Sequence, residues 1–110
     1  MRNRTVGLGL TVAISAVLFA ASGHGGTLAP DTVKALEQNP YVYIASERKG
    51  GAFGTPAEIW FMWHDDAVWV ASPPSAWRAK RIAAGRTRAR IAVGTKDGPS
   101  FAATGSFVPF

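Results

Sequence analysis

Cysteine is absent from the 110-residue chain, and its absence excludes several kinds of site. Disulfide bonds, thiolate catalysis and cysteine-ligated zinc or iron–sulfur centres cannot form, and a bacterial lipoprotein anchor has no attachment point. Histidine is scarce too, with only His24 and His64 in the chain. No nucleophile-elbow motif accompanies the serines. The sequence therefore predicts no catalytic side chain of the hydrolytic-triad kind.

A metal site is not expected either. His64, Asp65 and Asp66 are metal-ligating residue types, but they are adjacent in a predicted tight turn. Neighbouring side chains in such a turn point in different directions, so they do not converge on one ion. We interpret them as a solvated hairpin tip.

Acidic residues are also few, and none precedes Asp31. Seven Asp and Glu face twelve Lys and Arg, which gives a net charge of +5 and favours an anionic partner. Six cations lie between Arg78 and Arg90 with no acid among them. No nucleic-acid-binding motif accompanies this charge, so we expect no nucleic-acid partner.

The N-terminus has the pattern of an export signal. Arg2 and Arg4 precede an apolar stretch, residues 6–21, that ends in small residues. We predict a signal peptide over residues 1–22, and therefore a periplasmic or extracellular protein. The stretch is shorter than the roughly 20 residues of a membrane-spanning helix. The alternative is an uncleaved anchor formed by residues 6–21, in which case the membrane is a partner.

The remaining chain has the composition of one small, mainly β domain. It is rich in aromatic residues, and twelve Gly and seven Pro punctuate short apolar stretches. We expect a flexible lead-in over residues 23–30 and a single domain over residues 31–110. Strands are predicted over residues 41–45, 58–64, 67–71, 90–93 and 101–108.

Two short helices complete the prediction. Asp31 is the expected N-cap of the first, which ends at Asn39 before Pro40. Ser75 is the expected N-cap of the second, which extends to about residue 84 before Gly85.

The junction between the third strand and the second helix is a candidate phosphate site. Residues 72–81 place two hydroxyls (Ser72 and Ser75), an aromatic ring (Trp77) and several cations (Arg78, Lys80 and Arg81) together at the start of a helix. Free backbone amides and a guanidinium suit a phosphate. The alternative is a solvated helix face on which Ser75 is only a cap.

Several segments together resemble one protein family. Residues 41–48, 55–61 and 68–72 are similar to the first three strands of the pyridoxamine 5′-phosphate oxidase-like family, and residues 77–82 and 89–93 continue the match. The resemblance covers residues 31–108 and lies in the order and spacing of the segments. It implies a split β-barrel of the FMN-binding type. That family continues with a further helix and strand, so we expect a barrel that is incomplete at its C-terminus.

The resemblance also implies a cofactor and its contacts. By position, Ser72, Ser75, Trp77 and Arg78 would line the phosphate side of flavin mononucleotide, and Glu58 and Trp60 would lie near its ring. The protein would then be a flavin-binding oxidoreductase of unknown substrate whose cofactor performs the redox chemistry. Family cofactors sit between subunits, so a homodimer is expected.

Some features depart from this family pattern. The second strand carries no basic residue of the kind that oxidases of pyridoxamine phosphate use, which argues against that activity. The spacing of Pro74, Trp77 and Ile82 resembles the deazaflavin-dependent nitroreductase branch, so a deazaflavin coenzyme is an alternative. A second alternative is a non-catalytic exported split-barrel remnant that binds no cofactor.

Overall fold

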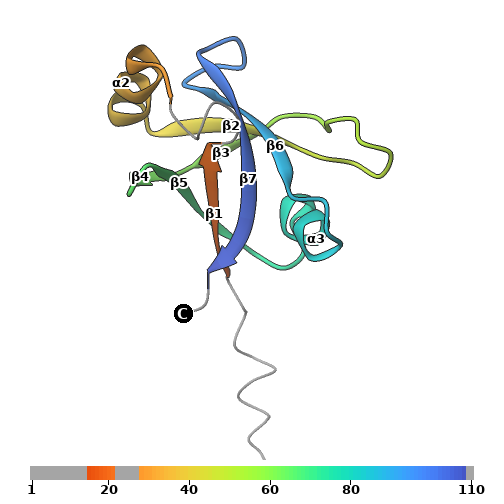
Figure 1. The fold of residues 1–110 in the computed structure, drawn as a ribbon. Coiled ribbons are helices and arrows are strands. Elements are labelled where there is room, and N and C mark those ends of the chain that lie inside the picture. The colour runs from red at the N-terminus through yellow and green to blue at the C-terminus, as the bar shows by residue number, and fades with distance from the viewer. Residues whose placement is uncertain (1–14, 22–27, 109–110) are drawn as a thin grey trace, which may run out of the picture.

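A computed structural model describes residues 15–21 and 28–108 of the chain, and these residues form a mainly β fold (Figure 1). The two helices in the described ranges are α2 (Pro30–Gln38) and α3 (Trp77–Ala83). The strands are β1 (Ser15–Ala21), β2 (Tyr41–Ser46), β3 (Ala57–Trp60), β4 (Met62–His64), β5 (Ala67–Ser72), β6 (Arg88–Val93) and β7 (Ser100–Val108). The predicted class, mainly β with short helices, is confirmed.

All seven strands belong to one antiparallel sheet in the order β3-β2-β6-β7-β1-β5-β4. The two edge strands, β3 and β4, follow each other in the chain with only Phe61 between them. The sheet therefore curls until its two edges meet at this residue, and it forms a nearly closed barrel. The prediction of one strand over residues 58–64 is wrong, because the chain changes its pairing partner from β2 to β5 at Phe61.

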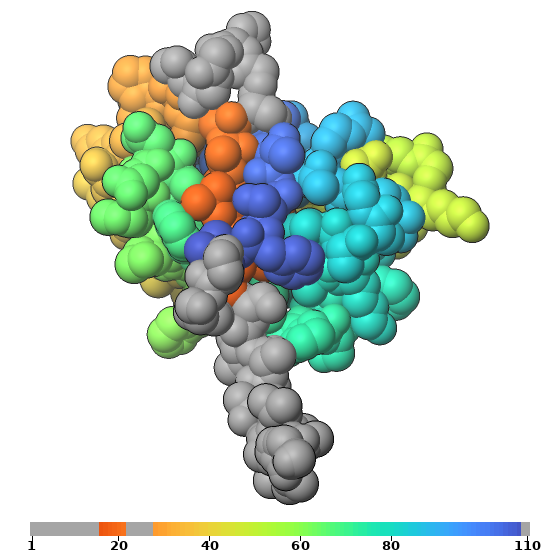
Figure 2. Space-filling view, turned by 60° about the horizontal axis from the view of Figure 1, so that its bottom comes forward, coloured from red at the N-terminus to blue at the C-terminus, as the bar shows by residue number. Residues whose placement is uncertain are grey.

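Strand β1 lies in the interior of the sheet. It pairs with β5 along one edge and with β7 along the other, and Figure 2 shows it between them. Val17 and Phe19 are buried because alternate side chains of the strand point into the barrel. The apolar segment that predicts an export signal thus also supplies a strand, and cleavage after residue 22 would remove it. The signal peptide stays a prediction, and residues 1–14 and 22–27 lie outside the described ranges.

The first helix begins earlier than predicted. Its N-cap is Ala29, and Pro30 is the first helical residue. Asp31 lies in the first turn and does not cap the helix. Proline is favourable there because its missing N–H needs no partner, so the predicted N-cap at Asp31 is wrong. The predicted end at Asn39 is confirmed, since Asn39 is the C-cap. Pro30, the last residue of the predicted lead-in over residues 23–30, is therefore the first residue of the helix.

The second helix begins later than predicted. Its N-cap is Ala76, whose N–H donates to the carbonyl of Pro73 and closes a turn. This turn holds Ser75 before the cap, where its exposed side chain makes no capping bond. The prediction that Ser75 caps the helix is wrong.

Asp65 and Asp66 form the turn of the β4–β5 hairpin, as predicted. Their φ angles of 51° and 56° are those of a two-residue turn whose twist matches that of the flanking strands. Within the described ranges no helix is both long and apolar enough to cross a membrane.

The barrel interior is filled by side chains from the strands and both helices. Gly105 of β7 marks the point where β1 and α3 meet, because a Cβ there would lie 2.7 Å from Phe19 Cε1 and 2.8 Å from Ile82 Cδ1. The core residues are Val17, Phe19, Leu36, Val42, Ile44, Ile59, Val68, Val70, Ile82, Ala89, Ile91, Val93, Phe101 and Ala103. Helix α3 therefore packs against β7 at Gly105, beside Phe19 of β1, and it also contacts β2.

The burial of β1 predicts the effect of removing one of its side chains. Phe19→Ala in the full chain should lower the free energy of unfolding by roughly 3–5 kcal/mol, because it opens a cavity in the core. Phe107→Ala on β7 is the matched control, since Phe107 is 41% exposed and should change stability much less. Urea unfolding measures both, and equal stability of the two variants would show that β1 is not in the core.

Candidate functional site

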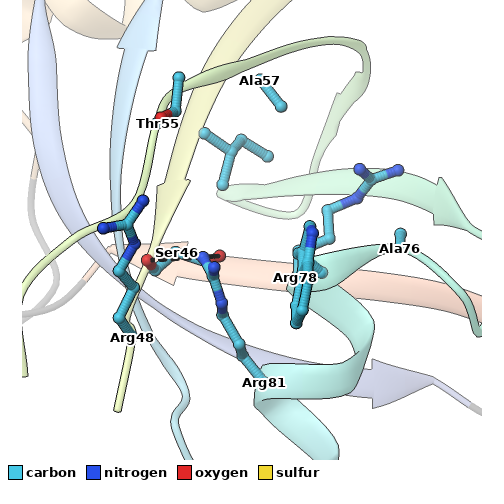
Figure 3. Close-up of a pocket in the computed structure, with 9 residues that line it drawn as sticks. Ser46, Arg48, Thr55, Ala57, Ala76, Arg78 and Arg81 are labelled. Atoms are coloured by element: carbon cyan, nitrogen blue, oxygen red, sulfur yellow. Dashed lines mark hydrogen bonds between the residues drawn. The ribbon is translucent and has the colours of Figure 1, made fainter. Parts of the chain in front are cut away.

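A cavity of about 410 Å³ lies where the end of β2, the loop before β3 and the start of α3 come together (Figure 3). Its size is in the range of small-molecule sites. The lining residues are Ile44, Ser46, Arg48, Thr55, Ala57, Ala76, Trp77, Arg78 and Arg81. The cavity thus combines three cations, two hydroxyls and an indole with a small apolar surface.

No carboxylate lines this cavity, so its three guanidinium groups are uncompensated. Among the described residues, none of Arg48, Arg78 and Arg81 forms an ion pair. Glu47 is the acid beside Arg48, but it accepts a 3.2 Å bond from Arg88 Nη2 on β6 instead. Hydrogen bonding from Arg88 holds the pKa of Glu47 below its ordinary value. The cavity is therefore a strongly cationic concavity of the kind that attracts an anion.

Arg78 is anchored to the strand that precedes its helix. Its Nε donates to Ser72 Oγ at 2.7 Å and its Nη2 donates to the carbonyl of Ala71 at 3.1 Å. Ser72 is fully buried, so this anchor is rigid. Burial lowers the pKa of Arg78, but a guanidinium keeps its charge in proteins. Two of its five N–H donors are used in these bonds, which leaves donors for a ligand.

Arg81 is anchored on the opposite wall of the cavity. Its Nη1 donates to Ser46 Oγ at 2.8 Å and to the Ser46 carbonyl at 3.3 Å. The same carbonyl accepts a 2.8 Å bond from the N–H of Gly54. These bonds tie the middle of α3 to the end of β2, across 35 positions in the sequence.

Trp77 supplies an exposed aromatic surface at the mouth of the cavity. Its side chain is 67% exposed, which is unusual for so large an apolar group. Lys80 Nζ and Arg81 Cζ lie 5.0 Å and 5.2 Å from its ring centroid, within the range of cation–π attraction. The indole is therefore held in place while much of its surface is open to a ligand.

The structure brings together only part of the predicted site. Trp77 and Arg78 line the cavity, and Ser72 supports Arg78 from below without lining it. Ser75 is exposed in the turn before α3 and does not line it.

Glu58 and Trp60 lie elsewhere. They alternate along β3 with Ala57, which lines the cavity, and Ile59, which enters the core, so they point to the other face of the strand. Glu58 Oε2 accepts a 2.5 Å bond from Tyr43 Oη, and Trp60 packs edge-on against Tyr41.

Sequence reasoning missed three polar residues of the cavity, namely Ser46, Arg48 and Thr55, and included Arg81 only as one of several cations at the junction. Ser46 and Arg48 come just after the predicted strand over residues 41–45. Arg81 belongs to the run of basic residues that begins at Arg78. The sequence shows that these residues are polar, but it does not show that the loop around Thr55 lies against α3.

Among the described residues there is no cluster of three His, Asp or Glu side chains that could hold a metal. His64 and Asp65 lie 3.2 Å apart at the exposed hairpin tip, and neither lines the cavity. A scan against protein-family models, a search of curated proteins and a search of solved structures found no match to this chain.

The bond between Tyr43 and Glu58 predicts a spectroscopic change. The carboxylate of Glu58 accepts a hydrogen bond from the hydroxyl of Tyr43. This bond is the main reason that the pKa of Tyr43 is raised above its ordinary value. Glu58→Gln removes the charge and should shift the ionisation of Tyr43 to lower pH, as measured by ultraviolet absorbance of tyrosinate. Glu37→Gln on α2 is the control and should leave the titration unchanged. A Tyr43 titration unaffected by Glu58→Gln would place Glu58 away from Tyr43.

Proposed function

We propose that the cavity binds flavin mononucleotide and that the protein is a flavin-binding oxidoreductase similar to the pyridoxamine 5′-phosphate oxidase-like family. One observation carries the proposal: three guanidinium groups and an exposed indole line one cavity that contains no carboxylate. A ligand with a phosphate and a planar aromatic ring complements both features.

The phosphate would be bound by Arg78. Its bonds to Ser72 and Ala71 fix the guanidinium before any ligand arrives, so little side-chain entropy is lost on binding. Helix α3 has only seven residues, so we assign the attraction to the charge of Arg78 rather than to the helix end.

The flavin ring would contact Trp77 and the apolar floor formed by Ile44 and Ala57. This assignment replaces the sequence-based expectation for Glu58 and Trp60, which point to the other face of β3. A homodimer, which the family resemblance implies, would place a second subunit over the open side of the flavin. We propose this assembly together with the cofactor.

The side chains of the cavity would bind and orient rather than exchange protons. None of the lining residues is of a type that titrates near neutral pH. A bound flavin would supply the redox chemistry, and the arginines would hold its phosphate.

Flavin fluorescence titration tests the proposal. The full chain should quench FMN fluorescence on binding, and Arg78→Ala should weaken affinity by roughly 1.5–3 kcal/mol because a charge-assisted bond is lost. Arg90→Ala on β6 is the matched control, since Arg90 is exposed and bonds to Ser100 outside the cavity.

Three outcomes decide between the proposal and its alternatives. Binding of a deazaflavin coenzyme in place of FMN, with the same dependence on Arg78, would assign the site to that cofactor. Absence of binding to both would favour a barrel without a cofactor. Equal effects of Arg78→Ala and Arg90→Ala would remove Arg78 from the site.

A further inference from the structure

Two hollows in the surface lie outside the flavin cavity and share none of its lining residues. The first, which we call the apolar groove, has a volume of about 550 Å³. Strands β1 and β7 contribute one residue each to it, and the others are Trp60, Phe61, Met62, Trp69, Val70 and Ala71. The second, which we call the acidic pocket, has a volume of about 450 Å³ and is lined by Leu36, Glu37, Asn39, Phe61, Met62 and Trp63. Because Phe61 and Met62 line both, the two hollows adjoin.

The apolar groove carries no charge on its strands and is shaped before any ligand arrives. Strands β1, β4, β5 and β7 contain no Asp, Glu, Lys or Arg. Trp60 and Met62 are 73% and 57% exposed, and exposed apolar surface of this kind marks binding sites. Trp69 is held by a 2.9 Å bond from its Nε1 to the carbonyl of His64, and Trp60 packs edge-on against Tyr41. The groove therefore suits the uncharged, apolar part of a ligand.

The acidic pocket has the opposite charge to the flavin cavity. Glu37 of α2 is the one charged residue among those that line it, and within the described ranges it forms no ion pair, not even with Lys34 one turn earlier. Phe61 and Trp63 pack against the core, so their rings are held in the same pocket as the carboxylate. A carboxylate and aromatic rings both attract an ammonium group.

We propose that the two hollows together bind a small amphiphilic cation, which is an apolar molecule with one ammonium group. The ammonium group lies in the acidic pocket beside Glu37, and the apolar part crosses Met62 into the groove lined by Trp60 and Trp69. Charge complementarity selects this class, because Glu37 repels an anionic head group although the whole chain has a net charge of +5. The site lies outside the flavin cavity and does not rest on the proposed function.

The surrounding charges favour a free molecule over a lipid surface as the occupant. Asp65 and Asp66 follow β4 directly after His64, and both are exposed. Together with Glu37 they make this part of the surface acidic, whereas membranes with anionic lipids attract basic surfaces.

Calorimetric titration of the full chain tests the preferred head group with three probes of the same alkyl chain. These are octyltrimethylammonium, octanol and octyl sulfate, each below its micelle concentration. The cation should bind about tenfold more tightly than octyl sulfate, because Glu37 attracts one head group and repels the other. Equal or tighter binding of octyl sulfate, which the net positive charge alone would favour, would overturn the proposal.

Neutralising Glu37 tests the position of the ammonium group. Glu37→Gln should weaken binding of octyltrimethylammonium by about threefold, as expected for an exposed ion pair, and leave the affinity for octanol unchanged. Asp31→Asn is the matched control, because it removes the same charge from an exposed position on the same helix outside the pocket. Equal effects of the two variants would place the ammonium group away from Glu37 and contradict the assignment.

Removing one indole tests the position of the apolar part. Trp60→Ala should weaken binding of octyltrimethylammonium and octanol alike by about tenfold, because it removes one wall of the groove. Trp77→Ala is the matched control, since Trp77 is 67% exposed and lines the flavin cavity instead. Both tryptophans are largely exposed, so both variants should fold. Equal affinities in the two variants would show that the alkyl chain does not lie in the groove.

The site and the flavin proposal fail separately. Binding of octyltrimethylammonium that depends on Glu37 and Trp60 in a chain that binds no FMN would support the site and overturn the flavin proposal. Displacement of bound FMN by the octyl cation would place the probe in the flavin cavity and overturn the site. Adsorption to phosphatidylcholine vesicles that requires Glu37, without binding of the free probe, would assign this surface to a membrane and also overturn the proposal.

Discussion

The double pairing of β1 is the constraint on which the rest of the structure depends. The sheet order places β1 between β7 and β5, so its two hydrogen-bonded ladders join β3-β2-β6-β7 to β5-β4. Phe19 of β1 also meets Ile82 of α3 across the bare backbone of Gly105. Helix α3 carries Arg78 and Arg81, so the packing beside β1 and the bonds to β5 and β2 together position the site.

The second organising feature is the separation of charges. Glu47 and Arg48 are neighbours, yet Glu47 bonds to Arg88 while Arg48 turns into the cavity. Successive side chains after the end of β2 point to opposite faces, so Glu47 and Arg48 lie on opposite sides of the chain. The cavity keeps an unbalanced positive charge, which lowers the stability of the empty protein slightly and raises its attraction for anions.

Local features of this fold could be predicted from the sequence, whereas contacts between distant segments could not. Asp65 and Asp66 encode the hairpin turn by their own conformational preference, and the aromatic and β-branched residues of β2 encode a strand. The bond from Arg81 to Ser46 spans 35 positions and leaves no local pattern. Two residues of the expected site, Glu58 and Trp60, do not line the cavity for a related reason. Glu58 and Trp60 alternate with Ala57 and Ile59 along β3 and therefore point to the opposite face of the strand. A resemblance in the order and spacing of segments does not show which residues of a strand face the cavity.

Strand β1 lies far from β7 in the sequence, and this separation has a consequence during synthesis on the ribosome. Its register joins Ala16 to Val108 and Ala21 to Ala103, so its partner β7 emerges almost a full chain length later. Contacts of such long range form late, so β5 becomes available to pair with β1 well before β7 does. The seven residues of β1 therefore gain their two partners in succession, and the β1–β7 ladder that joins the two parts of the sheet forms last.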